Sequence, residues 1–186
     1  MEKNVKRFQI ALSAMIIMAF LAMPFTVNGQ GKANFAGTWA MNAEKSNMGQ
    51  PPQGAGGGGQ GGGQRMGGGF GMGSNFTVKQ EANLLTVEST RTNQNGETTT
   101  TTSKYTLDGK ESINTTGRGE SKSTATWSSD GKTLTIKTSR TIDMQGETRT
   151  MTTTQEWTLA GPNLQIKTTS ATPQGDRTTT AVYDKK

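Results

Sequence analysis

Hydrophobic and polar residues alternate over most of the chain from residue 75 onward, which is typical of half-buried β-strands. Three segments share the order aliphatic, polar, aliphatic, charged: residues 85–88 (Leu-Thr-Val-Glu), 134–137 (Leu-Thr-Ile-Lys) and 164–167 (Leu-Gln-Ile-Lys). Each of these strand openings follows a turn signal, such as Asp130-Gly131. Threonine, a good strand former, fills many of the polar positions. The pattern predicts an all-β fold built from antiparallel hairpins.

The turn signals also assign the hairpins to ends, because alternate turns of an up-and-down meander share one end of the sheet. Turns at 82–83, 108–109, 130–131 and 161 fall at one end, and turns at 95–96, 117–119, 145–146 and 174–175 fall at the other. The alternation is regular if residues 110–116 also form a strand. A first strand is predicted over residues 34–42. The uneven spacing of the hairpins favours a meander over a solenoid.

One face of the predicted strands changes character along its length. At one end it is apolar, and we expect a structural core plug there made of Trp39, Leu134, Ile136, Leu164 and Ile166. At the other end the same face carries Ser89, Arg91, Thr101, Ser103, Thr138, Arg140, Thr153, Thr168 and Ser170. Residues 49–74 are a low-complexity, Gly-rich loop that leaves the first strand at this polar end. The sequence therefore predicts a cup that is plugged below and polar above.

The first 29 residues have the three parts of a cleavable signal peptide. Lys3, Lys6 and Arg7 precede an apolar run over residues 10–25, and a short polar stretch follows. Val27 and Gly29 are small enough for the −3 and −1 positions, so cleavage would release Gln30. An uncleaved N-terminal anchor is the alternative. We expect an exported protein, periplasmic or secreted, with one domain over residues 30–186.

The amino-acid composition argues against several classes of functional site. The chain has no Cys and no His, which removes disulfides, the commonest general base and the commonest metal ligand. The formal net charge of +6 falls to +4 without the leader, and the charged residues are interspersed along the strands. We therefore expect a mixed-charge surface, no nucleic-acid partner, no metal site and no transmembrane segment after cleavage. Carboxylate pairs and activated nucleophiles are missing from the pattern, so we expect no enzymatic activity.

Several of these residues together resemble a known family. Residues 37–39 (Gly-Thr-Trp), Asn42 and residues 44–46 (Glu-Lys-Ser) precede the low-complexity loop and an Asp-Gly-Lys-Thr-Leu hairpin at 130–134. This order resembles the small exported bacterial lipocalin-like proteins, which are calycin-like β-barrels. The resemblance implies a closed barrel of about 8–10 strands that binds a ligand without catalysis and without a cofactor. The C-terminal helix of typical lipocalins has no counterpart in this sequence.

The candidate ligand-binding residues are Arg91, Arg140, Tyr105, Trp127 and Trp157. An inward-facing arginine can clamp a carboxylate or phosphate, but arginines are also surface residues or members of structural ion pairs. The tryptophans can form a stacking platform for a ring-shaped ligand, or they can simply belong to the core. A bulge in either strand would turn Arg91 or Arg140 outward.

Two functional hypotheses remain open at this stage. The first is an exported binding protein, a monomer that holds a small molecule of unknown identity in a partly polar barrel interior. The second is a structural or surface-interaction protein of the cell envelope or matrix that has no small-molecule ligand.

Overall fold

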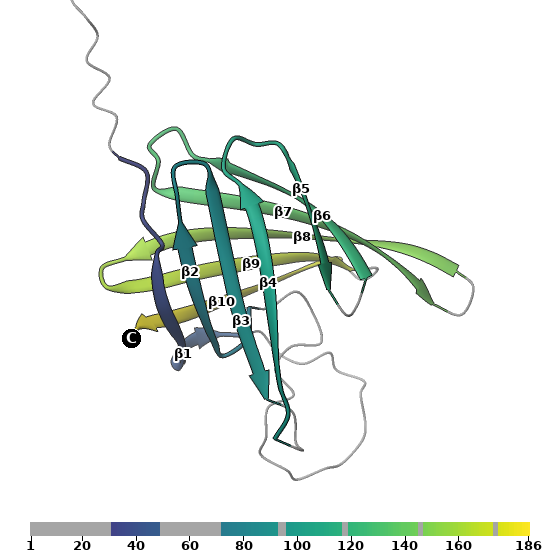
Figure 1. Cartoon of the computed structure of the whole chain (residues 1–186), viewed down its shortest axis with the longest axis horizontal. Coiled ribbons are helices and arrows are strands. Elements are labelled where there is room, and N and C mark those ends of the chain that lie inside the picture. Colours follow the sequence, from purple (N-terminus) through teal and green to yellow (C-terminus); the bar gives the residue numbers. More distant parts are fainter. Residues whose placement is uncertain (1–30, 49–71, 93–95, 117–118, 145–146, 173–174) are drawn as a thin grey trace, which may run out of the picture. The chain divides into compact units, whose positions relative to one another are not determined.

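Ten antiparallel strands and no helix make up the described part of the chain in the computed structural model (Figure 1). Residues 31–48, 72–92, 96–116, 119–144, 147–172 and 175–186 are described. The strands are β1 (Gly37–Asn47), β2 (Asn75–Gln80), β3 (Leu84–Thr92), β4 (Thr98–Thr106), β5 (Glu111–Thr116), β6 (Gly119–Trp127), β7 (Thr133–Met144), β8 (Glu147–Ala160), β9 (Asn163–Thr172) and β10 (Gly175–Lys185). The expected signal peptide and most of the Gly-rich loop lie outside the described residues.

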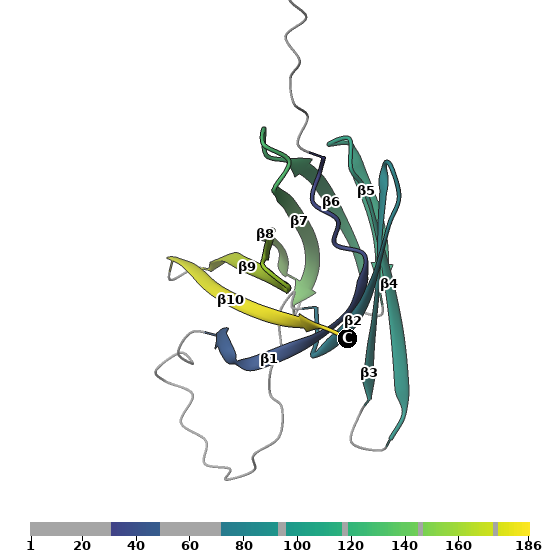
Figure 2. The same cartoon turned by 90° about the vertical axis from the view of Figure 1, so that its left-hand side faces the viewer.

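The strands form one up-and-down sheet that curls into a nearly closed barrel (Figures 1 and 2). Their order in the sheet is β4-β3-β2-β1-β10-β9-β8-β7-β6-β5. The first strand, β1, therefore pairs with the last strand, β10, in the middle of the sheet. The all-β class, the antiparallel meander and the number of strands are confirmed. The strand required over residues 110–116 is present as β5.

The barrel has a seam between β4 and β5, the two end strands of the sheet. No backbone ladder joins them within the described residues, although a tight turn at Asp108–Gly109 connects them. Side chains of β5 bridge the seam instead. The Asn114 amide accepts a hydrogen bond from Lys104 N at 2.7 Å and donates to Lys104 O at 2.9 Å. The Ser112 hydroxyl accepts from Thr106 N at 2.9 Å. Asn114 therefore substitutes for a peptide group of the missing ladder.

The apolar core fills the end of the barrel where the turns at 82–83, 108–109, 130–131 and 161 lie. The five residues of the expected plug are each at most 2% exposed: Trp39, Leu134, Ile136, Leu164 and Ile166. Leu159, which the alternation placed on the same face, is 39% exposed because it stands beyond Trp157, two residues before the turn at Gly161. Fifteen buried hydrophobic residues of the described chain form this core, and the inward positions beyond it are mainly polar.

The first strand begins later than predicted, at Gly37 rather than at residue 34. Residues 33–36 instead cross the end of the barrel and carry Phe35, which is fully buried, into the core. The Gln80 side chain holds this segment, since it accepts from Phe35 N at 2.8 Å and donates to Ala33 O at 2.9 Å. Gly37 turns the chain into β1 with a φ of 143°, and a Cβ there would lie 2.6 Å from Lys185 Cε.

Replacing Asn114 with alanine tests the seam. The Asn114→Ala change leaves the Lys104 N–H and C=O without their partners, so we expect the free energy of unfolding to fall by about 1–3 kcal/mol. Chemical denaturation measures this loss. Thr115→Ala, at the next and exposed position, should change stability by no more than about 0.5 kcal/mol. Equal stability of Asn114→Ala and the wild type would show that the bridge does not close the barrel.

Candidate functional site

Inward-facing side chains become more exposed along the barrel, from the apolar core towards the opposite end. Next to the core lie buried polar residues, namely Asn114, Ser121, Ser123, Thr153 and Gln155. Further along, the positions that alternate with the core on their strands are only half-buried: Ser89, Thr101, Ser103, Thr138, Arg140, Met151, Thr168 and Ser170. Side chains that face a filled interior would be buried. Burial of the inward side chains thus decreases from the core end of the barrel towards the opposite end.

Thr153 of β8 is the most deeply buried polar residue, at 1% exposure. It stands between Thr138 of β7 and Ser170 of β9 in the ladders. Its Oγ1 is buried and has no hydrogen-bond partner within the described part of the chain. A buried hydroxyl without a partner costs about 1–3 kcal/mol, so such groups normally bind a water molecule or a ligand.

The two candidate arginines differ in what the structure describes of them. Arg140 lies on β7, paired with Ser121 and Met151, and the register of both ladders is continuous. It therefore shares the inward face with Ile136, and its Nε is buried. Arg91 pairs with Thr99 in the β3–β4 ladder, and its side chain lies outside the described residues.

The candidate aromatic residues all lie at the core end. Trp157 is fully buried and donates a hydrogen bond to Gln155 Oε1 at 3.3 Å. Trp127 is partly buried and stacks on Phe35, with ring centroids 5.7 Å apart. Tyr105 is buried, and this burial raises the pKa of its hydroxyl despite a hydrogen bond with Ser103. The structure thus places these rings in or against the core, and Tyr105 reaches the half-buried residues through its hydrogen bond with Ser103.

The sequence interpretation missed part of the polar layer and part of the aromatic core. Ser121 and Ser123 lie on the face of β6 that points into the barrel. The alternation of small residues with Lys and Thr over residues 121–126 could have predicted this orientation. Ser123 Oγ lies 2.9 Å from Thr138 Oγ1. In the core, Phe76 packs edge-on against Tyr183 with centroids 4.8 Å apart. No turn signal or repeat marks either of these rings.

The Asn-x-x-Lys-Ser stretch forms a bulge in β1, away from the interior. Four residues between Asn42 and Asn47 stand opposite a single residue of β10. The Ser46 hydroxyl fills the gap, since it accepts from Val182 N at 2.9 Å and donates to Asn42 O at 2.6 Å. A serine hydroxyl thus replaces one step of the ladder, so the role of this part of the motif is structural.

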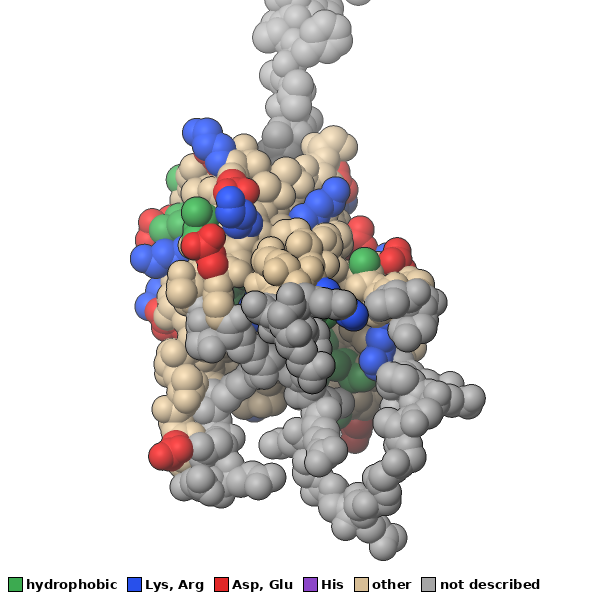
Figure 3. Space-filling model, turned by 90° about the vertical axis from the view of Figure 1, so that its right-hand side faces the viewer, with side chains coloured by type: hydrophobic (Ala, Val, Ile, Leu, Met, Phe, Trp, Pro, Cys, Tyr) green, Lys and Arg blue, Asp and Glu red, His purple; other side chains and the backbone are tan. Residues whose placement is uncertain are grey.

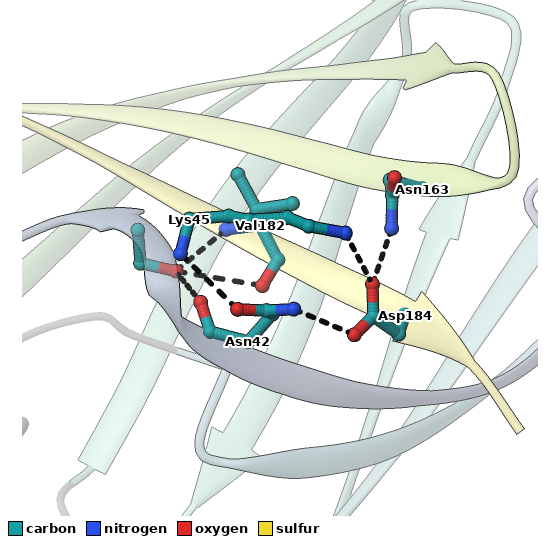
Figure 4. Close-up of polar contacts among 6 residues, drawn as sticks. Asn42, Lys45, Asn163, Val182 and Asp184 are labelled. Atoms are coloured by element: carbon teal, nitrogen blue, oxygen red, sulfur yellow. Dashed lines mark hydrogen bonds and ion pairs between the residues drawn. The ribbon is translucent and has the colours of Figure 1, made fainter.

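Asp184 ties this bulge to the β8–β9 turn, as Figure 4 shows. Its carboxylate accepts hydrogen bonds from the side-chain amides of Asn42, at 2.8 Å, and of Asn163, and it forms an ion pair with Lys45 at 3.4 Å. These contacts, the Asn42 hydrogen bond foremost, lower the pKa of Asp184 below its ordinary value. We call this group of four residues the Asp184 latch.

The outer surface carries charges of both signs. Glu88 pairs with Lys79 at 2.9 Å and Glu156 with Lys167 at 3.0 Å across neighbouring strands. Figure 3, which faces the end where the β7–β8 hairpin projects, shows basic and acidic side chains interspersed among polar ones. Within the described residues no three His, Cys, Asp or Glu side chains gather to hold a metal ion. No helix in the same residues is long and apolar enough to cross a membrane.

Comparison with solved structures finds the same kind of fold. The secretary abundant heat soluble (SAHS) protein from Ramazzottius varieornatus is similar with a TM-score of 0.51 and 14% identity, over 84% of this chain and 97% of that one. Zebrafish ileal bile acid-binding protein complexed with cholic acid has a TM-score of 0.43 and 21% identity, over 60% and 72% of the two chains. At 14% identity, the likeness to the SAHS protein concerns the fold alone. No protein-family model and no curated protein matches the chain.

The Asp184 latch predicts acid sensitivity. Because the folded-state pKa of Asp184 is lowered, the stability that its ionised form contributes is present above the unfolded-state pKa of about 3.9 and is lost as pH falls through the folded-state value. Asp108, whose pKa is lowered to about 2 mainly by the backbone N–H of Lys110, acts in the same direction. We expect the denaturant concentration at the unfolding midpoint to decrease as pH is lowered from about 4 to about 2. The decrease should be smaller in Asp184→Asn.

Denaturant titrations at a series of pH values measure this effect. Asp176→Asn, which removes an exposed carboxylate from the same strand, should keep the acid sensitivity of the wild type. An Asp184→Asn profile that is parallel to the wild-type profile would show that the latch contributes nothing to stability.

Proposed function

We propose that the protein is an exported, non-catalytic binding protein that holds a small molecule in the polar part of its barrel interior. The observation that carries the proposal is the buried Thr153 hydroxyl, which has no partner in the described chain and lies between the apolar core and the half-buried polar residues. The barrel fold is one that suits such a role, because closed antiparallel barrels of about eight or more strands can hold a ligand inside.

The lining indicates a ligand that is largely polar. Hydroxyl groups dominate the half-buried positions, and Arg140 adds a permanent positive charge to the same face. Met151 contributes an adaptable apolar contact beside Arg140. Since the candidate aromatic rings are packed in the core, we do not assign them to ligand contact. The mixed-charge exterior supports the absence of a nucleic-acid partner.

Thr153→Val tests this proposal, because valine keeps the shape of threonine and removes the hydroxyl. Without ligand, the variant should be as stable as the wild type or more stable, by up to about 1–3 kcal/mol, since an unpartnered buried hydroxyl is lost. Ligand affinity should fall by about threefold to tenfold, the worth of one hydrogen bond. Thr154→Val, which changes the neighbouring hydroxyl on the outer face of β8, is the matched control.

Native mass spectrometry of protein purified from its source provides the readout, before and after denaturation. An additional mass that is lost on unfolding, and is reduced in Thr153→Val but not in Thr154→Val, supports interior binding. A bare mass in all three proteins, also after exposure to cell extract, would contradict it and would favour the structural or surface-interaction role.

The proposal of export rests on residues 1–29 and is tested separately. Intact mass and N-terminal sequencing of the purified protein should give a chain that begins at Gln30. Gly29→Leu, which puts a large residue at the −1 position, should retain the leader. A full-length wild-type chain in the cytoplasm would refute this part of the proposal.

A further inference from the structure

The edge of β4 that faces the seam is only partly used. Along this edge the backbone of Lys104 and the N–H of Thr106 bond to side chains of β5. In an extended strand, residues two apart point their backbone groups to the same side. The β3–β4 register is continuous from Thr98 to Thr106, so Thr100 and Thr102 also point their N–H and C=O groups away from β3.

The hydrogen bonds from β5 side chains to the backbone of β4 involve Lys104 and Thr106, and none involves Thr100 or Thr102 among the described side chains. β4 runs past the end of β5 in both views of the cartoon (Figures 1 and 2). Thr100 and Thr102 are exposed, and within the described residues no backbone hydrogen bond is made on this side of either one. As far as the described residues show, β4 is therefore an open strand edge at Thr100 and Thr102.

The sequence of this edge favours the addition of another strand. Natural sheets protect their edges with charges, proline or bulges. Residues 98–102 are five consecutive threonines without any of these devices, and Lys104 stands where Asn114 already covers the edge. Threonine also has a high strand propensity. We call Thr98–Thr102 the β4 edge.

We propose that the β4 edge binds the same edge of a second copy of this chain, as an antiparallel strand pair centred on Thr100. In that register every cross-strand pair is threonine opposite threonine, so no like charges meet despite the net positive charge of the protein. On β3, Glu88 stands opposite Thr102 and is already paired with Lys79. Threonines pair in this way across β3 and β4, where the hydroxyls of Thr90 and Thr100 lie 3.4 Å apart.

This contact is isologous, so the β4 edge of each copy is used up once two copies have paired. Only residues whose backbone groups point away from β3 can bond to the second copy, and the central Thr100–Thr100 pair exchanges two backbone hydrogen bonds. The contact is small, which predicts a weak dimer whose population rises with protein concentration. It would replace the monomer expected from the sequence, and it is independent of whether the interior binds a ligand.

Two variants of the mature chain test the β4 edge. Thr100→Pro removes the N–H that the second copy needs, while no ladder bond to β3 is lost because that N–H faces the seam. Thr102→Lys adds a charge that protects natural edges. Thr100→Pro should weaken dimerisation at least about tenfold, as expected for the loss of two backbone hydrogen bonds per dimer. Thr102→Lys should also weaken it, because the added charge lies at the contact between the two copies. Thr158→Lys, on the outer face of β8 between Thr133 and Gln165, is the charge-matched control.

Sedimentation velocity over a range of concentrations measures the dimer, and hydrogen exchange locates it. A dimer that is lost in Thr100→Pro and Thr102→Lys but kept in Thr158→Lys, with exchange at residues 98–102 slowing as concentration rises, supports the proposal. A monomer at every concentration overturns it, as does a dimer that neither edge variant weakens. If Thr100→Pro fails to fold, which circular dichroism shows, Thr102→Lys alone decides.

Discussion

The packing of Phe35 against Trp127 and Trp157 is the contact on which the rest of the barrel depends. Both ring centroids lie 5.7 Å from that of Phe35, one stacked and one edge-on. This packing draws residues 33–36 across one end of the barrel, where the Gln80 amide holds them. In a chain with only 30% hydrophobic residues, the large apolar side chains have to gather at one end to form any core.

The same shortage of apolar residues accounts for the polar interior and for the seam. Beyond the core, most inward positions are filled by the short hydroxyl side chains of serine and threonine, and the longer ones include Gln155, Arg140 and Met151. At the seam, Asn114 and Ser112 supply hydrogen bonds that a regular ladder would have supplied. Both features add little to the free energy of unfolding, since a buried hydrogen-bonded polar group stabilises a fold less than apolar packing does. The two proposed binding regions, the interior and the β4 edge, lie where these polar groups replace apolar packing and a regular ladder.

The sequence predicted the fold well, because alternation and turn signals are local. The strand at residues 110–116 followed from counting turns, and the inward register of residues near Ile136 followed from period two. The seam and the crossing segment could not be predicted. The partner of the Asn114 side chain, Lys104, depends on which strands meet when the sheet closes, and this is not a local property of the sequence. Phe35 belongs to no repeat and follows no turn signal, so the sequence does not show that it enters the core. In the same way, the hydroxyl of Thr153 differs from its many neighbours only through the packing around it.

An experimental structure of the mature protein at a resolution that places water molecules tests the central claim most directly. The claim is that the interior above the core is open and that Thr153 faces it. We expect ordered water or a bound small molecule within hydrogen-bonding distance of Thr153 Oγ1, with further density along the half-buried inward residues. An interior packed by side chains, with the Thr153 hydroxyl bonded to one of them, would contradict the account.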